Sequence, residues 1–200
     1  MSAVARASAL YSEWLLPNRL HVCWVPLLLS LGLGYGLLVL YRGGRLCLSS
    51  VAGLRRHPAR MLEQAVSMAG HPAGYRHLQE AQLPPELLQQ ARLFFCGGAH
   101  VPLALQQQWH QLTGHYIHAT YGLSEAGFLV AAHTPMDVNP HTDGRILPGI
   151  HHRLCHPAQQ VDTGTDTGEL WLQSQLMMSA YWQNRGAMES RMTRDGWLRT

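Results

Sequence analysis

The chain has 200 residues, of which 46% are apolar and 14% are charged, a balance typical of a well-buried globular chain rather than a disordered one. Its formal net charge is only +3 and no block of like charge occurs, so nucleic-acid binding is not expected. All 15 basic residues are arginines, which excludes Schiff-base chemistry and phosphate binding through a lysine amine.

Strands and helices are predicted to alternate through the first part of the chain. Apolar runs predict strands at 21–29, 45–48, 92–96 and 115–120. Helices are predicted at 32–41, 58–68 and 102–113, with a break at 70–74 and a further short helix that opens at Pro84 and Pro85. This alternation indicates a parallel sheet with right-handed crossover connections.

The run from 22 to 40 is apolar and uncharged, and Arg19 and Arg42 flank it. By length it could span a bilayer, which leaves a single-span membrane protein as one alternative. Pro26 and repeated glycines weaken one continuous helix, so a buried strand followed by a buried helix is favoured and a membrane is not expected. The N-terminal residues lack the charged, apolar and small-residue pattern of an export signal, so none is expected.

The pattern changes near residue 142, after which helical periodicity is weak. Leu170 and Leu172 alternate with more polar neighbours, as in a half-buried strand, and the segment 162–168 has the composition of a tight turn. The predicted fold class is therefore α/β. A partial parallel-sheet subdomain at 1–141 is expected to be followed by a β-rich, barrel-like part at 142–200.

Four cysteines lie far apart, with no C-x-x-C pair, at Cys23, Cys47, Cys96 and Cys155. Such spacing is typical of a reduced, cytoplasmic protein with buried thiols. Cys155 also stands beside His151, His152 and His156, the densest group of possible metal ligands. The spacing matches no recognised zinc pattern, so a solvated loop is the favoured interpretation and a metal site the alternative.

The densest chemical signal follows the predicted strand at 115–120. It is the sequence Y-G-L-S-E-A-G, from Tyr121 to Gly127. An aromatic ring can stack on a base, a hydroxyl can bond a phosphate oxygen, and a carboxylate can ligate Mg²⁺. Ligands of parallel α/β sheets bind at the carboxyl ends of strands, where this segment is expected to lie. Alone, the segment could equally be a turn with a helix-capping serine.

Further short motifs occur around it in a fixed order. The sequence G-G-A at 97–99 precedes it, and G-R-I-L-P-G at 144–149, G-E-L at 168–170, Y-W at 181–182 and D-G-W-L-R-T at 195–200 follow it. Together these motifs resemble the adenylate-forming, or AMP-binding, superfamily. The resemblance covers about 26–200 and is nearest to acyl-CoA synthetases and fatty acyl-AMP ligases. It implies an internal piece of the large domain of such a ligase.

The resemblance implies roles for the matching residues. Tyr121 would stack on adenine, and Gly122 would shape the turn that follows the ring. The opposite face of the base would be lined by Gly97, Gly98 and Ala99. Ser124 would contact the α-phosphate of ATP, Glu125 would ligate Mg²⁺, and Gly127 would border the acyl pocket. The implied substrate is a fatty or other carboxylic acid, and the acyl acceptor is CoA or an acyl carrier protein.

Several devices of the family are missing from this sequence. Its phosphate-binding loop with a lysine, the Gly-Asp that follows R-T, and the C-terminal domain with a catalytic lysine have no counterpart here. Loss of one charge-stabilising group costs on the order of 10²–10³ in rate. We therefore expect this polypeptide to be inactive as a ligase by itself. A non-catalytic remnant, or a subunit completed by another chain, is the main alternative.

A serine hydrolase is a further alternative. The sequence G-L-S-E-A at 122–126 nearly matches the nucleophile elbow G-x-S-x-G, with Ser124 as nucleophile. The fifth position is alanine instead of glycine, and the other ordered motifs would remain unexplained. The adenylate-forming interpretation is therefore preferred.

Overall fold

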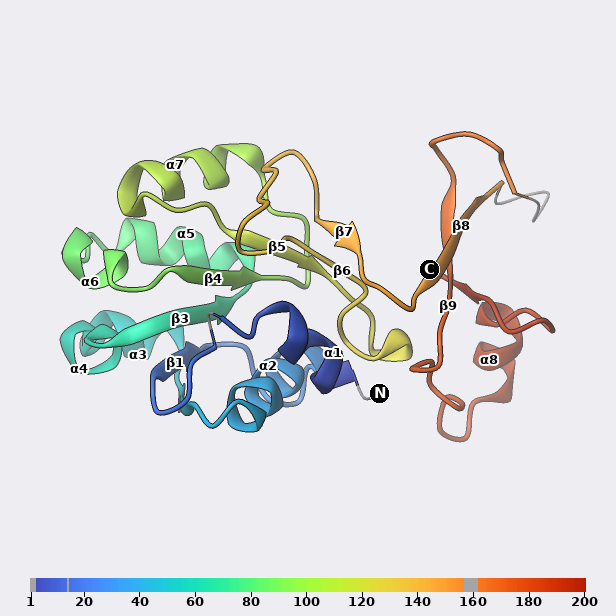
Figure 1. Cartoon of the computed structure of the whole chain (residues 1–200), viewed down its shortest axis with the longest axis horizontal. Helices are drawn as coiled ribbons and strands as arrows, with labels where there is room; N and C mark the ends of the chain where they lie inside the picture. Colours follow the sequence, from blue (N-terminus) through green and yellow to red (C-terminus); the bar gives the residue numbers. More distant parts are fainter. Residues whose placement is uncertain (1–2, 14, 157–161) are drawn as a thin grey trace.

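The fold is built on two β-sheets of different size. The computed structural model describes residues 3–13, 15–156 and 162–200. Within these residues the large sheet has seven strands in the order β2-β1-β3-β4-β5-β6-β7, and the small sheet has three in the order β10-β9-β8. Figure 1 shows the small sheet and α8 beyond β7, at one end of the molecule. The expected α/β class is confirmed.

The first five strands of the large sheet run parallel, and β5, β6 and β7 pair antiparallel. The strands of this sheet are β1 (Leu20–Cys23), β2 (Arg45–Leu48), β3 (Ala65–Gly70), β4 (Leu93–Cys96), β5 (His118–Tyr121), β6 (Ala131–Ala132) and β7 (Arg145–Ile146). The small sheet is antiparallel and consists of β8 (His151–Cys155), β9 (Glu169–Gln173) and β10 (Leu198–Arg199).

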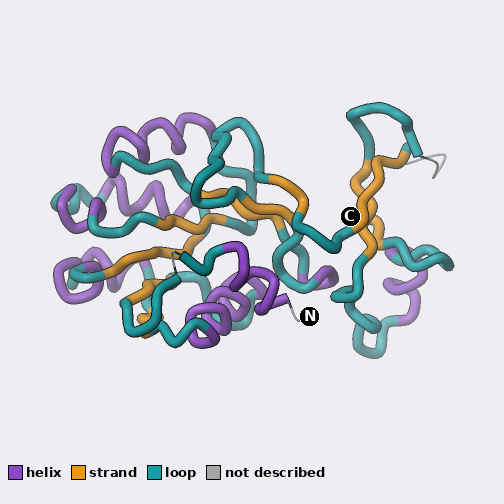
Figure 2. The backbone as a smooth tube through the Cα atoms, in the orientation of Figure 1, coloured by secondary structure: helices purple, strands orange, loops and turns teal. Residues whose placement is uncertain are grey.

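Helices cover both faces of the large sheet (Figure 2). The helices are α1 (Ala3–Leu10), α2 (Ser30–Tyr41), α3 (Val51–Arg56), α4 (Pro58–Leu62), α5 (Pro72–Glu80), α6 (Pro85–Gln89), α7 (Leu103–Thr113) and α8 (Arg185–Arg191). The side chains of strand β4 pack into two hydrophobic cores, one on each face of the large sheet. Phe95 packs with residues of α1 and α2, whereas Phe94 packs with residues of α3 to α7. Side chains alternate along a strand, so β4 must be apolar throughout.

The apolar run at 22–40 does not form the long strand that we expected at 21–29. Strand β1 ends at Cys23, because Pro26 has no N–H to donate and its carbonyl instead accepts from Leu29 N–H in a turn at 3.0 Å. Helix α2 forms as expected but is not fully buried, since Leu33, Leu37 and Leu40 on it are exposed, as is Leu28 just before it. Among the described residues, no helix is long and apolar enough to cross a membrane.

The helix predicted at 58–68 is wrong beyond Leu62. Helix α4 is short, Gln64 turns the chain with φ of 70°, and the central strand β3 begins at Ala65. The break predicted at 70–74 is also wrong, because α5 already begins at Pro72. The small residues there serve close packing instead. A Cβ on Gly70 would collide with the Trp24 indole, which packs directly on the strand.

Two expectations for the last part of the chain need correction. The alternation of Leu170 and Leu172 with their neighbours predicts Trp171 on the opposite, solvent side of a half-buried strand, yet Trp171 is only 2% exposed. The guanidinium groups of Arg153 and Arg199 lie 4.8 and 5.2 Å from its ring centroid, and these cation–π contacts cover it. Helix α8 was not predicted at all; Asn184 caps it by accepting from Ala187 N–H at 3.0 Å.

Two buried histidines, His118 in β5 and His133 just after β6, accept hydrogen bonds from the backbone of a neighbouring strand. His118 Nδ1 accepts from Phe94 N–H at 3.3 Å, and His133 Nδ1 accepts from Ala119 N–H at 3.0 Å. Both rings must stay neutral at Nδ1 to do this. Burial, together with the nearby His133, lowers the pKa of His118 from 6.5 to about 3.

This buried histidine makes stability depend on pH. The folded pKa of His118 lies below the unfolded value, so its contribution is complete above about pH 6.5 and falls towards pH 3. The expected loss is about 1.4 kcal/mol of unfolding free energy per pH unit. Urea unfolding between pH 7 and pH 4 measures it. His118→Asn should flatten this dependence, whereas H77N, on the exposed side of α5, should leave it as in the wild type; equal slopes for all three chains contradict the assignment.

Candidate functional site

A cavity of about 560 Å³ lies at the carboxyl ends of the parallel strands. Its wall takes residues from the segments that follow β1, β3, β4 and β5. The lining includes Leu29 and Leu31 near the start of α2, Pro72 of α5, and Gly98, with Ser124 from the loop after β5. Ligands of open parallel sheets bind at this end, and an apolar wall with a few polar groups is typical of a small-molecule site.

The Gly97–Ala99 turn forms one wall of this cavity and approaches β5 closely. A Cβ on Gly97 would lie 2.6 Å from Thr120 Oγ1, which itself donates to Cys96 O at 3.0 Å. Gly98 has φ of 82°, in the left-handed region that favours glycine. The turn after β4 therefore needs its glycines for two reasons, close approach at the first and backbone conformation at the second.

The Tyr121–Gly127 segment continues from β5 at the same end of the sheet. Tyr121 is partly buried and packs against the core that lies on the α1 and α2 side. Its carbonyl accepts from Val130 N–H at 2.8 Å, which closes a loop back to β6. A Cβ on Gly122 would collide with the Phe128 carbonyl, so this loop requires glycine there.

The structure brings only some of the predicted site residues to the cavity wall. Gly97, Gly98, Ala99 and Ser124 line it. The other predicted residues, in the described part of the chain, do not line it: Tyr121 ends β5, and Gly122, Glu125 and Gly127 belong to the same loop as Ser124. The two predicted motifs therefore meet at one place, with Ser124 as the direct link between them.

Glu125 is tied to the β-rich part of the chain. Ser124, Glu125 and Ala126 form a single 3-10 turn. The Tyr181 hydroxyl donates to Glu125 Oε1 at 2.7 Å, and Met178 N–H donates to Glu125 O at 2.8 Å. The hydrogen bond to Glu125 raises the pKa of Tyr181, so its phenol stays protonated and remains a donor.

Basic side chains at the cavity were not singled out from the sequence. Arg76 of α5, His71 and His100 all contribute to the wall. His100 Nδ1 lies 3.0 Å from Asp143 Oδ1, which links the turn after β4 to the loop before β7. No sequence signal marks these residues, because each stands outside the recognised motifs and only the fold brings them together.

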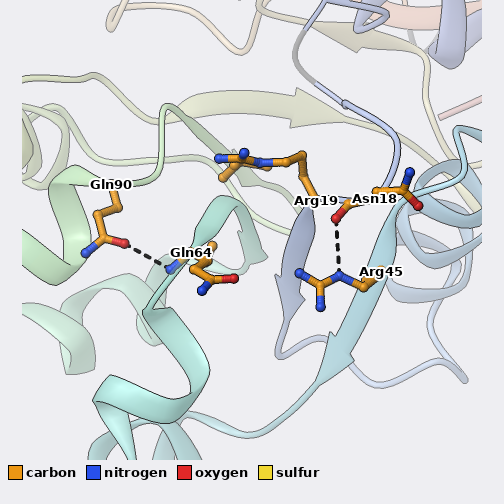
Figure 3. A pocket seen from close by; sticks show the side chains of 7 residues that line it. Asn18, Arg19, Arg45, Gln64 and Gln90 are labelled. Atoms are coloured by element: carbon orange, nitrogen blue, oxygen red, sulfur yellow. Dashed lines mark hydrogen bonds between the residues drawn. The ribbon is translucent and has the colours of Figure 1, made fainter.

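A second hollow lies at the opposite, amino end of the strands. It encloses about 450 Å³ and is lined by Arg19, Arg45, Gln64 and Gln90, among others (Figure 3). Its polar groups are partly satisfied internally: Arg45 Nε donates to Asn18 O at 3.2 Å. In parallel sheets the ligand end is the carboxyl end, so we assign the candidate site to the other cavity.

The structure contradicts the metal alternative for the histidine group. Cys155 is fully buried, while His151, His152 and His156 are exposed. In the described residues, no group of three or more His, Cys, Asp or Glu side chains could hold a metal ion. All four cysteines are free thiols, and Cys47 is the one that is not fully buried.

The serine hydrolase alternative finds no geometric support at Ser124. A nucleophile elbow places its serine on a strained turn beside a histidine base. Positive φ values among the described non-glycine residues occur elsewhere in the chain, not at Ser124. Nor does any described histidine form a hydrogen bond with Ser124 Oγ.

Comparison with known proteins identifies the family. The AMP-binding enzyme family matches residues 1–182, so this chain belongs to that family, as the ordered motifs indicated. Probable CoA ligase CCL8 of Humulus lupulus is 31% identical over 114 residues, 56% of this chain and 18% of that protein. A long-chain-fatty-acid–CoA ligase of Yersinia pestis is 35% identical over 117 residues, 54% of this chain and 19% of that protein.

Solved structures share the fold. MatB of Rhodopseudomonas palustris with ATP bound has a TM-score of 0.83 at 20% identity, covering 98% of this chain and 40% of that one. A malonyl-CoA ligase in complex with methylmalonyl-CoA and AMP has a TM-score of 0.79 at 26% identity, covering 98% of this chain and 44% of that one. The chain therefore spans less than half the length of these relatives.

Substituting Gly97 tests the close approach between the two motifs. Gly97→Ala places a methyl group against Thr120 and should cost about 1–3 kcal/mol of unfolding free energy through overpacking. Gly186→Ala is the matched control, since a Cβ there meets open space at the start of α8. Urea unfolding compares the two. Equal stability of the two variants would show that β4 and β5 do not meet as described.

Proposed function

We propose that this chain carries part of the nucleotide and acyl-adenylate site of a carboxylate-activating ligase. The whole ligase would use ATP and Mg²⁺ to join a fatty or other carboxylic acid to AMP. It would then pass the acyl group to CoA or an acyl carrier protein. The observation that supports this most strongly is the meeting of the Gly97–Ala99 turn and Ser124 at one cavity in a member of the AMP-binding enzyme family.

The proposed roles follow the chemistry of each side chain. Tyr121 stacks on adenine, which faces Gly97, Gly98 and Ala99 on its other side, and Gly122 allows the turn. Ser124, exposed at the cavity, donates to an α-phosphate oxygen. Gly127 borders the acyl pocket; its φ of 80° requires the left-handed conformation. The division at 141 and 142 stays a prediction, and β7 at 145–146 still pairs with the large sheet.

The donor set near the cavity fits Mg²⁺ bound with a nucleotide. Glu125 offers a carboxylate and Ser124 a hydroxyl, and both are hard oxygen donors. Mg²⁺ commonly uses one or two carboxylates together with substrate phosphates and water, so it needs no complete protein cage. The ion would neutralise phosphate charge during attack by the carboxylate, while Glu125 fixes its place on this chain.

The amino-acid composition favours a second candidate function, in which this chain does not catalyse the ligase reaction by itself. It has no lysine, although the family uses lysines at the phosphate loop and in the C-terminal domain. Leu28, Leu33, Leu37 and Leu40 leave an apolar surface on and before α2. Such a surface is typical of one that contacts another domain or chain. A non-catalytic remnant, or a subunit completed by another chain, fits these features.

Titration calorimetry tests the nucleotide site. We expect binding of a non-hydrolysable octanoyl adenylate analogue, and Tyr121→Ala should weaken it at least tenfold, because stacking on one base contributes about 1–3 kcal/mol. Tyr41→Ala is the control, as Tyr41 is exposed on α2 away from the cavity lining. Binding that survives in Tyr121→Ala, or falls equally in the control, would contradict the stacking role.

ATP–pyrophosphate exchange tests turnover separately. Acetate, malonate, octanoate and palmitate are each supplied with ATP, Mg²⁺ and the wild-type chain. We expect no exchange above background, because the charge-stabilising lysines are missing from this polypeptide. Exchange with any of these acids that disappears in Glu125→Gln would overturn the proposal that this chain is inactive alone.

A further inference from the structure

Tyr181 belongs to a motif that the proposed roles leave unused. It stands in the Y-W pair of the β-rich part, 56 residues from Glu125 along the chain, yet its hydroxyl donates to Glu125 Oε1 at 2.7 Å. A neighbouring backbone group, Met178 N–H, holds the Glu125 carbonyl at 2.8 Å. One loop from the β-rich part therefore fixes both the main chain and the side chain of Glu125.

From this geometry we infer that Tyr181 is a positioning residue, which orients the Glu125 carboxylate for Mg²⁺. The inference rests on the proposed function. A hydroxyl held on Oε1 leaves Oε2 available to a cation. Outer partners of this kind set the orientation of a ligating carboxylate, and their removal commonly weakens metal binding by about 10- to 100-fold.

The local structure gives Glu125 little other support. Its 3-10 turn has no side-chain cap, and no other side chain in the described part of the chain donates to its carboxylate. The Trp182 ring next to Tyr181 is 88% exposed, so it adds no apolar packing beside the carboxylate. The hydroxyl-to-carboxylate bond is thus the contact that decides where the carboxylate points, and it is charge-assisted.

Tyr181→Phe removes this hydroxyl and keeps the ring. In calorimetric titrations of the full chain with ATP, we expect the variant to bind 10- to 100-fold more weakly with Mg²⁺ present. With EDTA in place of Mg²⁺, its affinity should equal that of the wild type. Tyr116→Phe is the matched control, because Tyr116 stacks on His110 of α7 and should behave as wild type in both conditions.

A second measurement reports the contact without any nucleotide. Tyr181→Phe should lower the urea midpoint of the wild-type chain, but should change it little in a Glu125→Gln background, since the charged partner is already gone. The same pair should be non-additive for ATP binding with Mg²⁺. Glu125→Gln alone should also lose the benefit of Mg²⁺.

The ATP affinities of Tyr181→Phe with Mg²⁺ and with EDTA distinguish a metal-positioning role from a purely structural one. Equal losses with Mg²⁺ and with EDTA would show a purely structural role and overturn the inference. Unchanged affinity in both conditions would also overturn it. If the wild-type chain binds no ATP in either condition, the proposed function fails and the metal role of Tyr181 fails with it. The urea cycle would then still show whether the contact itself exists.

Discussion

The pairing of β4 with β5 is the contact on which the candidate site depends. Phe95 and Cys96 lie beside His118 and Ala119, and the Thr120 hydroxyl donates to Cys96 O just before both strands end. This register brings the glycine turn after β4 against the loop after β5. A shift of one residue would turn the side chains of β5 to the opposite faces and separate the two motifs.

The position of the site also depends on how the chain continues the sheet after β5. There the sheet changes from parallel to antiparallel pairing, and β6 and β7 continue it from residues close in sequence. This change lets the chain leave the sheet, form the small sheet and return with Tyr181 to Glu125. The β-rich part therefore contributes to the candidate site, because its Tyr181 supplies the hydrogen bond that orients the proposed metal ligand Glu125.

Much of this could be predicted from the sequence, for identifiable reasons. Strand β2 lies where its short apolar run predicted it, helix α7 ends at Gly114 as its pattern indicated, and the ordered motifs identified the family. Strand β3 was missed, since its first residues fall within the helix predicted at 58–68 and its last residue, Gly70, is small because the Trp24 indole packs on it. Trp171 was misplaced because its cover comes from arginines distant in sequence. The Tyr181–Glu125 bond likewise joins residues that only the folded chain brings together.

The leucines exposed on and before α2 have a consequence for any measurement in solution. A surface of this kind gains free energy when two copies cover it, at about 25 cal/mol per Å² removed from water. Self-association would then be linked to ligand binding by mass action. Apparent dissociation constants would drift with the protein concentration in the cell of the instrument, and only values extrapolated to dilute protein would describe the single chain.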